Sequence, residues 1–221
     1  LTSFPFSVTL AIDIDYNVMT KKKSTKNWLK KHTKDKYVKM SITSRYRSRA
    51  FHKLQEIDEK YKVIKSANNI IDLGASPGSW SEYISRNYRH KKLIAVDQIV
   101  MDPIEGVEFI HGDINNSEHR DKIRQIITNA DLVLSDIAPN ITGIEDVDQA
   151  HFFEIFESIS SICSDFLNKK GILVMKFFNG LSCDSVKKRL KMLFNEVNTY
   201  KPDSSRSRSN EVFFVCIGYK D

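Results

Sequence analysis

The chain has 221 residues, of which 41% are hydrophobic and 28% charged, a composition typical of one folded domain with a hydrophobic core. No stretch reaches the roughly 18 consecutive apolar residues that a membrane-spanning helix needs, so we expect no passage through a bilayer. The formal net charge is +6 and the sequence pI is about 9.1, which favours a polyanionic partner.

The positive charge is concentrated near the N-terminus. Residues 21–60 contain 14 Lys and Arg against 4 Asp and Glu, a formal charge of +10, so the other 181 residues sum to −4. Lys and Arg displace condensed counterions from phosphate backbones, which makes this segment a candidate RNA-binding arm. A solvated lysine-rich tract would have the same composition. The expected contacts are Lys21–Lys23, Lys30, Lys31, Arg45, Arg47 and Arg49, with Arg206 and Arg208 from a later loop.

The three cysteines, Cys163, Cys183 and Cys216, are far apart and form no CxxC pair. This spacing disfavours a disulfide scaffold and a zinc site, so we expect inert thiols, no metal and a reducing, intracellular compartment. Residues 1–20 contain two Asp and no Lys or Arg, unlike a transit peptide or a secretory signal. A mitochondrion or another organelle, the nucleus, the nucleolus and the cytoplasm all stay open.

From residue 68 onward, short apolar runs rich in β-branched residues alternate with amphipathic helical patterns. The runs predict seven strands, over Asn69–Leu73, Lys92–Val96, Glu108–His111, Asp131–Ser135, Ile172–Phe177, Glu196–Tyr200 and Val212–Ile217. Apolar spacings of three and four predict helices over Trp80–Asn87, Ile123–Thr128, Phe152–Leu167 and Val186–Phe194. The alternation indicates an α/β fold with a mostly parallel seven-stranded sheet.

Two long loops interrupt this alternation. Lys201–Asn210 joins the last two strands without a helical pattern, which predicts an antiparallel last strand. We expect this loop, with Lys201, Arg206 and Arg208, to stand away from the sheet edge. Ile137–Asp148 follows the strand that ends at Asp136, and open α/β sheets bind ligands at such carboxyl ends.

A glycine-containing turn follows the first predicted strand. Gly74 and Gly78 would let the backbone approach a ligand, and the next helix would offer free N–H groups, although a turn without a ligand would look the same. Asp97 ends the second strand and Asp113 follows the third, where carboxylates can bind a nucleoside cofactor. These strand ends resemble the S-adenosylmethionine site of class I methyltransferases, whereas the GxGxxG of dinucleotide sites is absent. The expected cofactor residues are Gly74, Ser76, Pro77, Gly78, Trp80, Asp97, Asp113 and Asp136.

Four charged residues have apolar or loop neighbours, at positions where the fold itself does not require a charge. Lys53 precedes the first strand, Asp136 ends the fourth, Lys176 lies inside the apolar run 173–178, and Glu211 opens the last strand. A charge buried among apolar neighbours needs a partner. The four residues are therefore candidates for a catalytic site, although a structural ion-pair network would also explain them.

The sequence resembles the FtsJ (RrmJ) family of RNA 2′-O-methyltransferases from about Trp28 to Lys220. The motifs that carry the resemblance are Arg47–Ala50 with Lys53-Leu54, Asp72–Gly74 with Pro77-Gly78 and Trp80, Met101–Ile104, Ser135-Asp136 with Ala138–Asn140, and Lys201–Arg206. By resemblance, Lys53, Asp136, Lys176 and Glu211 match the catalytic Lys-Asp-Lys-Glu tetrad of the family. Ser79 stands where glycine is common and Ser76 where alanine is common, so the cofactor turn departs from the family pattern.

The resemblance implies methylation of a ribose 2′-hydroxyl with S-adenosylmethionine, on a uridine of large-subunit ribosomal RNA in assembled particles. Asp203 and the form Leu73-Gly74-Ala75-Ser76 favour this branch over the related transfer RNA anticodon-loop enzymes. Loss of a tetrad residue would have favoured a silent RNA-binding scaffold, and a small-molecule methyltransferase would not need the basic segment. We expect a monomer with a basic, partly disordered arm over residues 1–40 and a methyltransferase domain over residues 41–221.

Methyl transfer to a hydroxyl also requires removal of its proton. A free lysine is mostly protonated at neutral pH and is therefore a poor base. Burial and the neighbouring ammonium of Lys53 are expected to lower the pKa of Lys176 into the range of general bases. Lys176 is thus the candidate base, and Asp136 and Glu211 are expected to orient the lysines.

Overall fold

The computed structural model describes residues 36–43, 45–139, 142–180, 183–206 and 209–220. Within these ranges one sheet contains seven strands, β1 Asn69–Leu73, β2 Lys92–Asp97, β3 Val107–His111, β4 Ala130–Ser135, β5 Leu167–Phe178, β6 Phe194–Tyr200 and β7 Glu211–Tyr219. All seven predicted strands are confirmed. Only β5 differs in its bounds by more than two residues, because it starts at Leu167 instead of Ile172.

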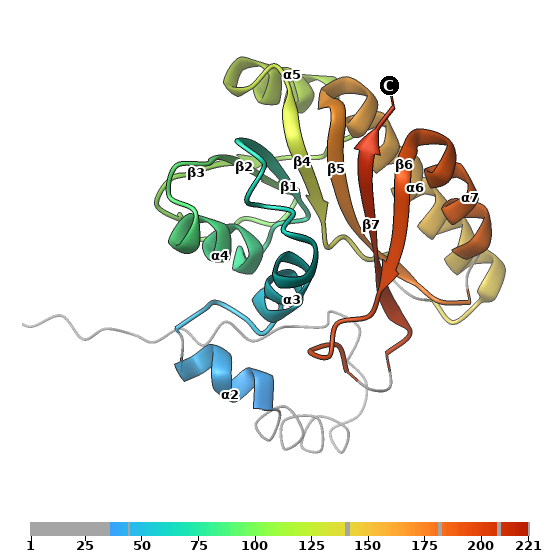
Figure 1. Cartoon of the computed structure of the whole chain (residues 1–221), viewed down its shortest axis with the longest axis horizontal. Coiled ribbons are helices and arrows are strands. Elements are labelled where there is room, and N and C mark those ends of the chain that lie inside the picture. The colour runs from blue at the N-terminus through green and yellow to red at the C-terminus, as the bar shows by residue number, and fades with distance from the viewer. Residues whose placement is uncertain (1–35, 44, 140–141, 181–182, 207–208, 221) are drawn as a thin grey trace, which may run out of the picture.

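The strand order is β3-β2-β1-β4-β5-β7-β6 (Figure 1). β7 runs antiparallel to both of its neighbours, β5 and β6, and the other neighbouring strands pair in parallel. The expected antiparallel last strand is therefore confirmed. The carboxyl ends of β1 to β5 and the start of β7 all lie at one edge, which we call the carboxyl edge of the sheet; the opposite edge is the amino edge.

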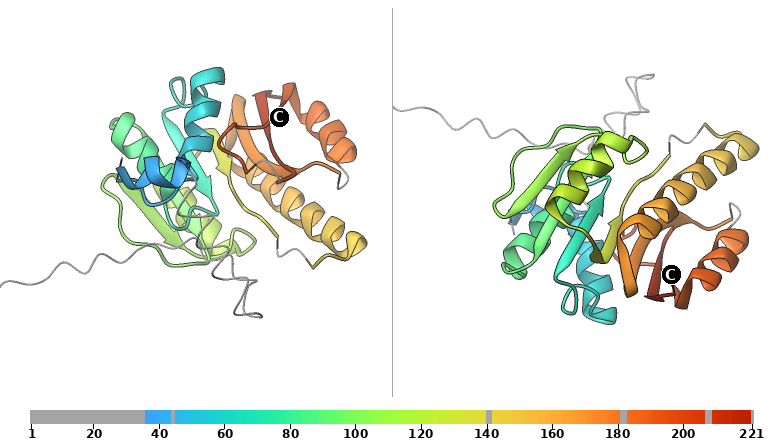
Figure 2. Two further views of the ribbon diagram at one scale, coloured as in Figure 1. Left: turned by 90° about the horizontal axis from the view of Figure 1, so that it is seen from below. Right: turned by 90° about the horizontal axis from the view of Figure 1, so that it is seen from above.

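Helices cover both faces of the sheet (Figures 1 and 2). The helices α3 Phe51–Tyr61 and α4 Ser79–Asn87 pack on one face with Ile70 of β1. On the other face, Ile71 packs in a core with α5 Ser117–Ile126, α6 Glu145–Phe166 and α7 Cys183–Leu193. Because both faces of the central strands are buried, their sequences are nearly continuous apolar runs.

Several helical features differ from the expectation. α5 begins at Ser117, before the expected Ile123, and ends at Ile126. No helix was expected over α3, whose buried apolar residues Phe51, Leu54 and Ile57 are separated by charged and polar residues. α6 begins at Glu145, before the expected Phe152, with an acidic first turn that suits a helix N-terminus. A short helix, α2 Lys36–Thr43, lies within the basic segment, whereas residues 1–35 are outside the described residues.

The loop between β6 and β7 was expected to stand away from the sheet edge, but it is hydrogen-bonded to α3. The backbone N–H groups of Asp203 and Ser204 donate to the two carboxylate oxygens of Glu56 on α3, at 2.6 and 2.9 Å. Ser204 and Ser205 are consequently buried. The Glu56 carboxylate holds the loop against α3, because backbone N–H groups that leave the solvent need an acceptor. Arg208 lies outside the described residues.

The three cysteines are free, and Cys163 and Cys216 are buried in the core. Burial raises the pKa of the Cys163 thiol to about 12 and also raises the pKa of Cys216, so both thiols stay protonated at neutral pH. In the described part of the chain, no helix combines the length and the apolar character needed to cross a membrane.

Candidate active site

The turn between β1 and α4 depends on two glycines. Gly74 has a φ of +70°, and a Cβ there would lie 2.5 Å from Cγ1 of Ile137, in the loop after β4. Gly78 has a φ of +101°, and its Cβ would lie 2.7 Å from Cδ1 of Ile104, in the loop after β2. Both positions therefore require glycine for backbone conformation and for space. The turn lies closely packed between the loops that follow β2 and β4.

Hydrogen bonds join the ends of the first three strands. The backbone N–H of Gly74 donates to the carbonyl of Val96 on β2 at 2.9 Å, and the N–H of Gly112 donates to the carbonyl of Asp97 at 2.8 Å. The Asp97 carboxylate accepts from the N–H groups of Ser76, at 2.8 Å, and Ile99, at 2.7 Å. The predicted cofactor residues Gly74, Ser76 and Asp97 are thus brought together at the carboxyl edge.

The carboxylates at this edge retain capacity for a ligand. Asp113 accepts from the N–H of Asn115 through Oδ1 at 2.8 Å, which leaves Oδ2 without a hydrogen-bond partner among the described residues. Each oxygen of Asp97 accepts a single hydrogen bond and can accept another. Acceptors at the ends of β2 and β3 fit a ribose diol and an amino group on a base. The residues present therefore fit a nucleoside cofactor.

Arg47 joins two loops of the candidate cofactor site. Its guanidinium donates to the carbonyl of Pro77 at 3.0 Å, in the turn after β1. It also donates to the carbonyls of Asp102 and Pro103, each at 2.7 Å, in the loop after β2. Arg47 had been expected to contact RNA, but three backbone carbonyls engage its donors. The side chain instead bridges the β1–α4 turn to the loop after β2.

The rest of the Arg47–Ala50 motif contacts α4 and the loop after β6. The hydroxyls of Ser48 and Ser79 are 2.7 Å apart and buried, which gives the serine at position 79 a partner. The indole N–H of Trp80 donates to the carbonyl of Ala50 at 2.9 Å, and its ring packs against Phe213 in the core. Trp80 therefore has no polar atom left for a ligand. Arg49, also expected to contact RNA, is buried and donates to the carbonyl of Ser204.

The strand alternation brings the other predicted site residues to the face that α3 and α4 cover. Leu132 and Leu134 of β4 belong to that core, and Asp136, two residues further, continues the series. Lys176 continues the series of Val174 on β5, and Glu211 precedes Phe213 of β7 by two residues. Lys53 comes from α3 on the same face. Successive side chains alternate between faces, so all four residues share one side of the sheet.

The four residues form two ion pairs. Lys176 Nζ lies 2.8 Å from Oδ1 of Asp136 and also donates to the main-chain carbonyl of Asp136. Lys53 Nζ lies 2.8 Å from Oε2 of Glu211, whose Oε1 accepts from the hydroxyl of Ser205 at 2.8 Å. The Lys176 side chain is 9% exposed and that of Glu211 is 11% exposed. The structure thus places four largely buried charges in compensating pairs.

Asp136 interacts with both lysines. Burial would raise the pKa of Asp136, but the charges of Lys176 and Lys53 outweigh it and lower the pKa below its usual range. Burial would likewise lower the pKa of Lys53, but Asp136 and Glu211 outweigh it and raise the pKa. Two ammonium groups and two carboxylates therefore form one connected network. The negative charge of Asp136 interacts with the positive charges of both lysines.

Two supporting residues were not predicted from the sequence. Ser205, which binds Glu211, lies in the 201–206 motif, but that motif gave no indication of its partner. Asp72 at the end of β1 is buried, and its Oδ2 accepts from the hydroxyl of Ser81 at 2.7 Å. Burial raises the pKa of Asp72 to about 7, against the lowering effect of Ser81. Nothing in the sequence pattern links positions 72 and 81.

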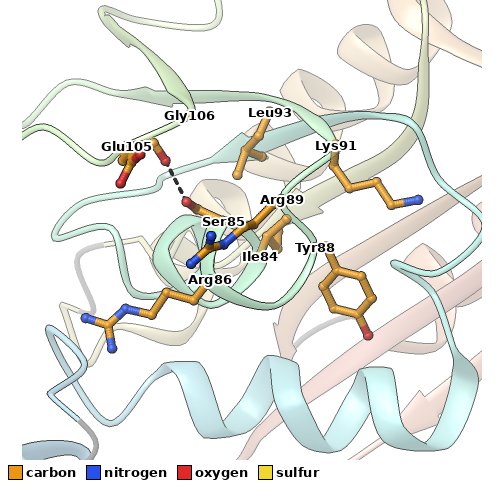
Figure 3. Close-up of a pocket in the computed structure, with 9 residues that line it drawn as sticks. All are labelled: Ile84, Ser85, Arg86, Tyr88, Arg89, Lys91, Leu93, Glu105 and Gly106. Carbon is orange, nitrogen blue, oxygen red and sulfur yellow. Dashed lines mark hydrogen bonds between the residues drawn. The ribbon is translucent and has the colours of Figure 1, made fainter.

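Two further features lie outside this site. Among the described residues, no group of three or more His, Cys, Asp or Glu side chains could hold a metal ion. A cavity of about 180 Å³ lies at the C-terminal end of α4 and is lined in part by Arg86, Arg89 and Lys91 (Figure 3). It shares no lining residue with the site described above.

The sheet order, the glycine turn and the acidic ends of β2 and β3 define a class I methyltransferase fold. A family model described as FtsJ-like methyltransferase matches residues 46–219, and the chain belongs to this family.

Relatives are similar over almost their whole length. The chain is 41% identical over 199 residues to Ribosomal RNA large subunit methyltransferase E of Pelagibacter ubique, covering 90% of this chain and 98% of the relative. It is 42% identical over 208 residues to the protein of that name in Francisella tularensis, covering 91% and 100%. The crystal structure of a ribosomal RNA methyltransferase from Plasmodium falciparum superposes with a TM-score of 0.70 at 33% identity, covering 79% of this chain and 98% of that one.

Proposed function

We propose that the protein transfers a methyl group from S-adenosylmethionine to a ribose 2′-hydroxyl of large-subunit ribosomal RNA. The observation that carries the proposal is the network of Lys53, Asp136, Lys176 and Glu211 beside the cofactor turn at the carboxyl edge. The relatives named for large-subunit ribosomal RNA match over at least 90% of this chain, which supports the substrate class. A uridine as the target nucleotide follows from the family resemblance.

The proposed cofactor residues divide into two groups. Asp97 accepts hydrogen bonds from the ribose, Asp113 accepts from the adenine amino group, and Gly74 allows close approach of the backbone. Arg47 and Trp80 instead hold the turn in place, because their donors are bound to backbone carbonyls. When bound, S-adenosylmethionine supplies an electrophilic methyl group on a positively charged sulfonium.

The tetrad residues carry out the proton transfer. Lys176 Nζ, as the neutral amine, accepts the proton of the 2′-hydroxyl while the hydroxyl oxygen takes up the methyl group. Asp136 fixes the position of Lys176 through two contacts. Glu211, held by Ser205, fixes Lys53.

In vitro methylation tests the substrate assignment. The purified protein is incubated with labelled S-adenosylmethionine and, separately, with intact large ribosomal subunits, protein-free ribosomal RNA and transfer RNA, all from cells that lack the protein. We expect one 2′-O-methylated nucleotide in the large-subunit RNA. Methylation of a transfer RNA anticodon loop instead would contradict the substrate assignment. No transfer to any of these RNAs would favour a silent RNA-binding scaffold.

The remaining expectations stay proposals. RNA binding by residues 21–31 of the basic segment falls in the part of the chain that the structure does not describe. The boundary between residues 40 and 41 lies within α2, and the division into an arm and a catalytic domain stays a prediction. The monomeric state and the intracellular location are likewise proposals that accompany the ribosomal substrate.

A further inference from the structure

A cluster of cations lies at the amino edge of the sheet, opposite the candidate active site. It is formed by the turn after α3, with Lys62 and Lys65, and by the connection between α4 and β2, with Arg89 and Lys91, together with Lys92 at the start of β2. The Lys91 ammonium donates to the carbonyl of Lys65 at 3.0 Å, and the N–H of Lys92 donates to the carbonyl of Asn68 at 2.8 Å. We call these five residues the amino-edge patch.

The patch is accessible, and most of its charges are free. Lys62, Lys65, Arg89 and Lys92 are exposed. Among the described residues, none of these four side chains has a hydrogen bond or an ion pair. Cations without partners on two adjacent turns form a concentrated positive surface, where a solvated face would usually intersperse acids.

Two of the acidic groups nearby, Asp131 and Asp58, are engaged by other partners, whereas Glu105 is exposed and lines the cavity at the C-terminal end of α4. Asp131 accepts from the backbone N–H groups of Asn68 and Asn69, and from the side chain of Asn168. Asp58 is buried and accepts from the N–H of Ile64 and the hydroxyl of Tyr88. The Asp131 and Asp58 carboxylates stabilise the turns themselves, so their remaining capacity to neutralise the patch is small.

A hollow extends the patch. The cavity of about 180 Å³ has Arg89 and Lys91 in its lining together with the buried side chains of Ile84 and Leu93. Figure 3 shows Lys91 and Arg86 directed to opposite sides of this cavity, with Arg89 between them. The Arg86 guanidinium is bound to Glu82 at 2.7 Å and the Lys91 ammonium to the carbonyl of Lys65 at 3.0 Å, which leaves Arg89 as the lining cation without a partner among the described residues. Such a hollow can take a phosphate group and part of its sugar.

We propose that the amino-edge patch binds the phosphate backbone of a second RNA segment, separate from the one that enters the active site. This inference rests on the proposed function. β1 has five residues and β2 six, so the two edges are roughly 17–20 Å apart at about 3.3 Å per residue. A nucleotide at the carboxyl edge and its immediate neighbours do not reach the patch. Folded RNA presents a second segment at that distance, and the patch therefore favours folded RNA over a short single strand.

The test compares two triple charge reversals. The patch variant is Lys65→Glu/Arg89→Glu/Lys92→Glu. The matched control is Lys122→Glu/Lys188→Glu/Lys191→Glu, which makes the same change in net charge at exposed lysines of α5 and α7. Binding is measured against salt concentration with two probes: protein-free large-subunit RNA, and a single-stranded oligonucleotide of ten residues or so. A neutral patch variant with three Gln residues and thermal unfolding curves identify any loss of folding.

We expect the patch variant to bind the folded RNA at least about tenfold more weakly, with a salt slope smaller by about 2–3, since each phosphate contact contributes about 0.9. Binding of the oligonucleotide and of S-adenosylmethionine should not change, and the control variant should match the unmodified protein. Equal losses in both triple variants, or none in the patch variant, would overturn the proposal. Since the readout is binding, failure of the methylation assay is distinguishable from failure of this inference.

Discussion

The ammonium group of Lys176 lies 2.8 Å from Oδ1 of Asp136 and also donates to the main-chain carbonyl of Asp136. Lys176 belongs to β5, and Asp136 follows β4, its parallel neighbour. Two contacts to one residue fix where the amine lies before any substrate binds. Such pre-positioning is what a general base needs, because proton transfer requires hydrogen-bond distance to the reacting hydroxyl.

Asp97→Ala should weaken binding of S-adenosylmethionine. The change removes the acceptor proposed for the ribose and also the contact that holds the N–H of Ser76. Hydrogen bonds to charged groups contribute about 1.5–3 kcal/mol, so we expect Kd to rise roughly ten- to a hundredfold. Isothermal titration calorimetry measures this, with Asp184→Ala, at an exposed position on α7, as the control. Unchanged affinity in Asp97→Ala would remove Asp97 from the cofactor site.

Arg47→Met should act on the cofactor and leave electrostatic RNA binding nearly unchanged. Methionine keeps much of the side-chain length but loses the donors to Pro77, Asp102 and Pro103. We expect a higher KM for S-adenosylmethionine, a smaller change in kcat and an unchanged salt slope of RNA binding. If the salt slope fell by about 0.9 and KM stayed the same, Arg47 would be a phosphate contact instead.

Asp72 should make the stability of the protein depend on pH. Burial raises its pKa to about 7 from an ordinary value of 3.8, so between these values the folded state holds a proton that the unfolded chain has lost. The stabilisation is therefore fully present below about pH 4 and is lost as the pH rises through 7. Asp72→Asn should abolish this loss and become relatively more stable at high pH, by up to about 4 kcal/mol.

Urea unfolding at pH 5 and pH 8 measures the effect on Asp72→Asn and on the unmodified protein. Other groups titrate equally in both proteins, so the difference between them isolates Asp72. Asp121→Asn, at an exposed position on α5, is the control and should show no trend with pH. A difference in the free energy of unfolding that is the same at both pH values would contradict the raised pKa.

Replacing Lys53 and Glu211 together should restore the stability that each single replacement loses, but it should not restore methyl transfer. Lys53→Met or Glu211→Leu alone leaves a largely buried charge without its partner, a change that costs about 3–5 kcal/mol in fully buried pairs. The double variant should regain most of this stability, because an apolar pair replaces the ion pair. Its methyl-transfer rate should nevertheless stay low, since Asp136 then lacks Lys53. Recovery of turnover together with stability would mean that the pair is only structural.

The sheet could be predicted because its strands are buried on both faces. Continuous apolar runs such as Ile70–Leu73 are visible in a sequence, and the turns that follow them locate the strand ends. α3 could not be predicted in the same way, because three buried apolar residues among charged ones give a weak pattern. Its position was settled by tertiary packing against β1, which no local sequence signal reports.

The sequence allowed the residues of the candidate site to be predicted, but not which of them contact one another. Lys176 is visible as a charge in an apolar strand, and the other three as charges beside apolar or loop residues, while the family resemblance supplied their catalytic role. The sequence does not show which lysine pairs with which carboxylate, because Lys53 and Glu211 are separated by 158 positions. Arg47 was assigned to RNA from its charge alone. Its acceptors are backbone carbonyls, which every residue has and no sequence pattern distinguishes.

The role of Lys176 as the catalytic base is tested most directly by the single-turnover rate of methyl transfer to intact large-subunit particles. Lys176→Ala should lower the rate by about 10²–10⁴-fold with an unchanged Kd for S-adenosylmethionine, since the proposed cofactor contacts are on the ends of β1 to β3. Lys176→Arg should fail as well, because a guanidinium stays protonated. A rate near that of the unmodified protein for Lys176→Ala across neutral pH would contradict the account and leave the four charges as a structural ion-pair network.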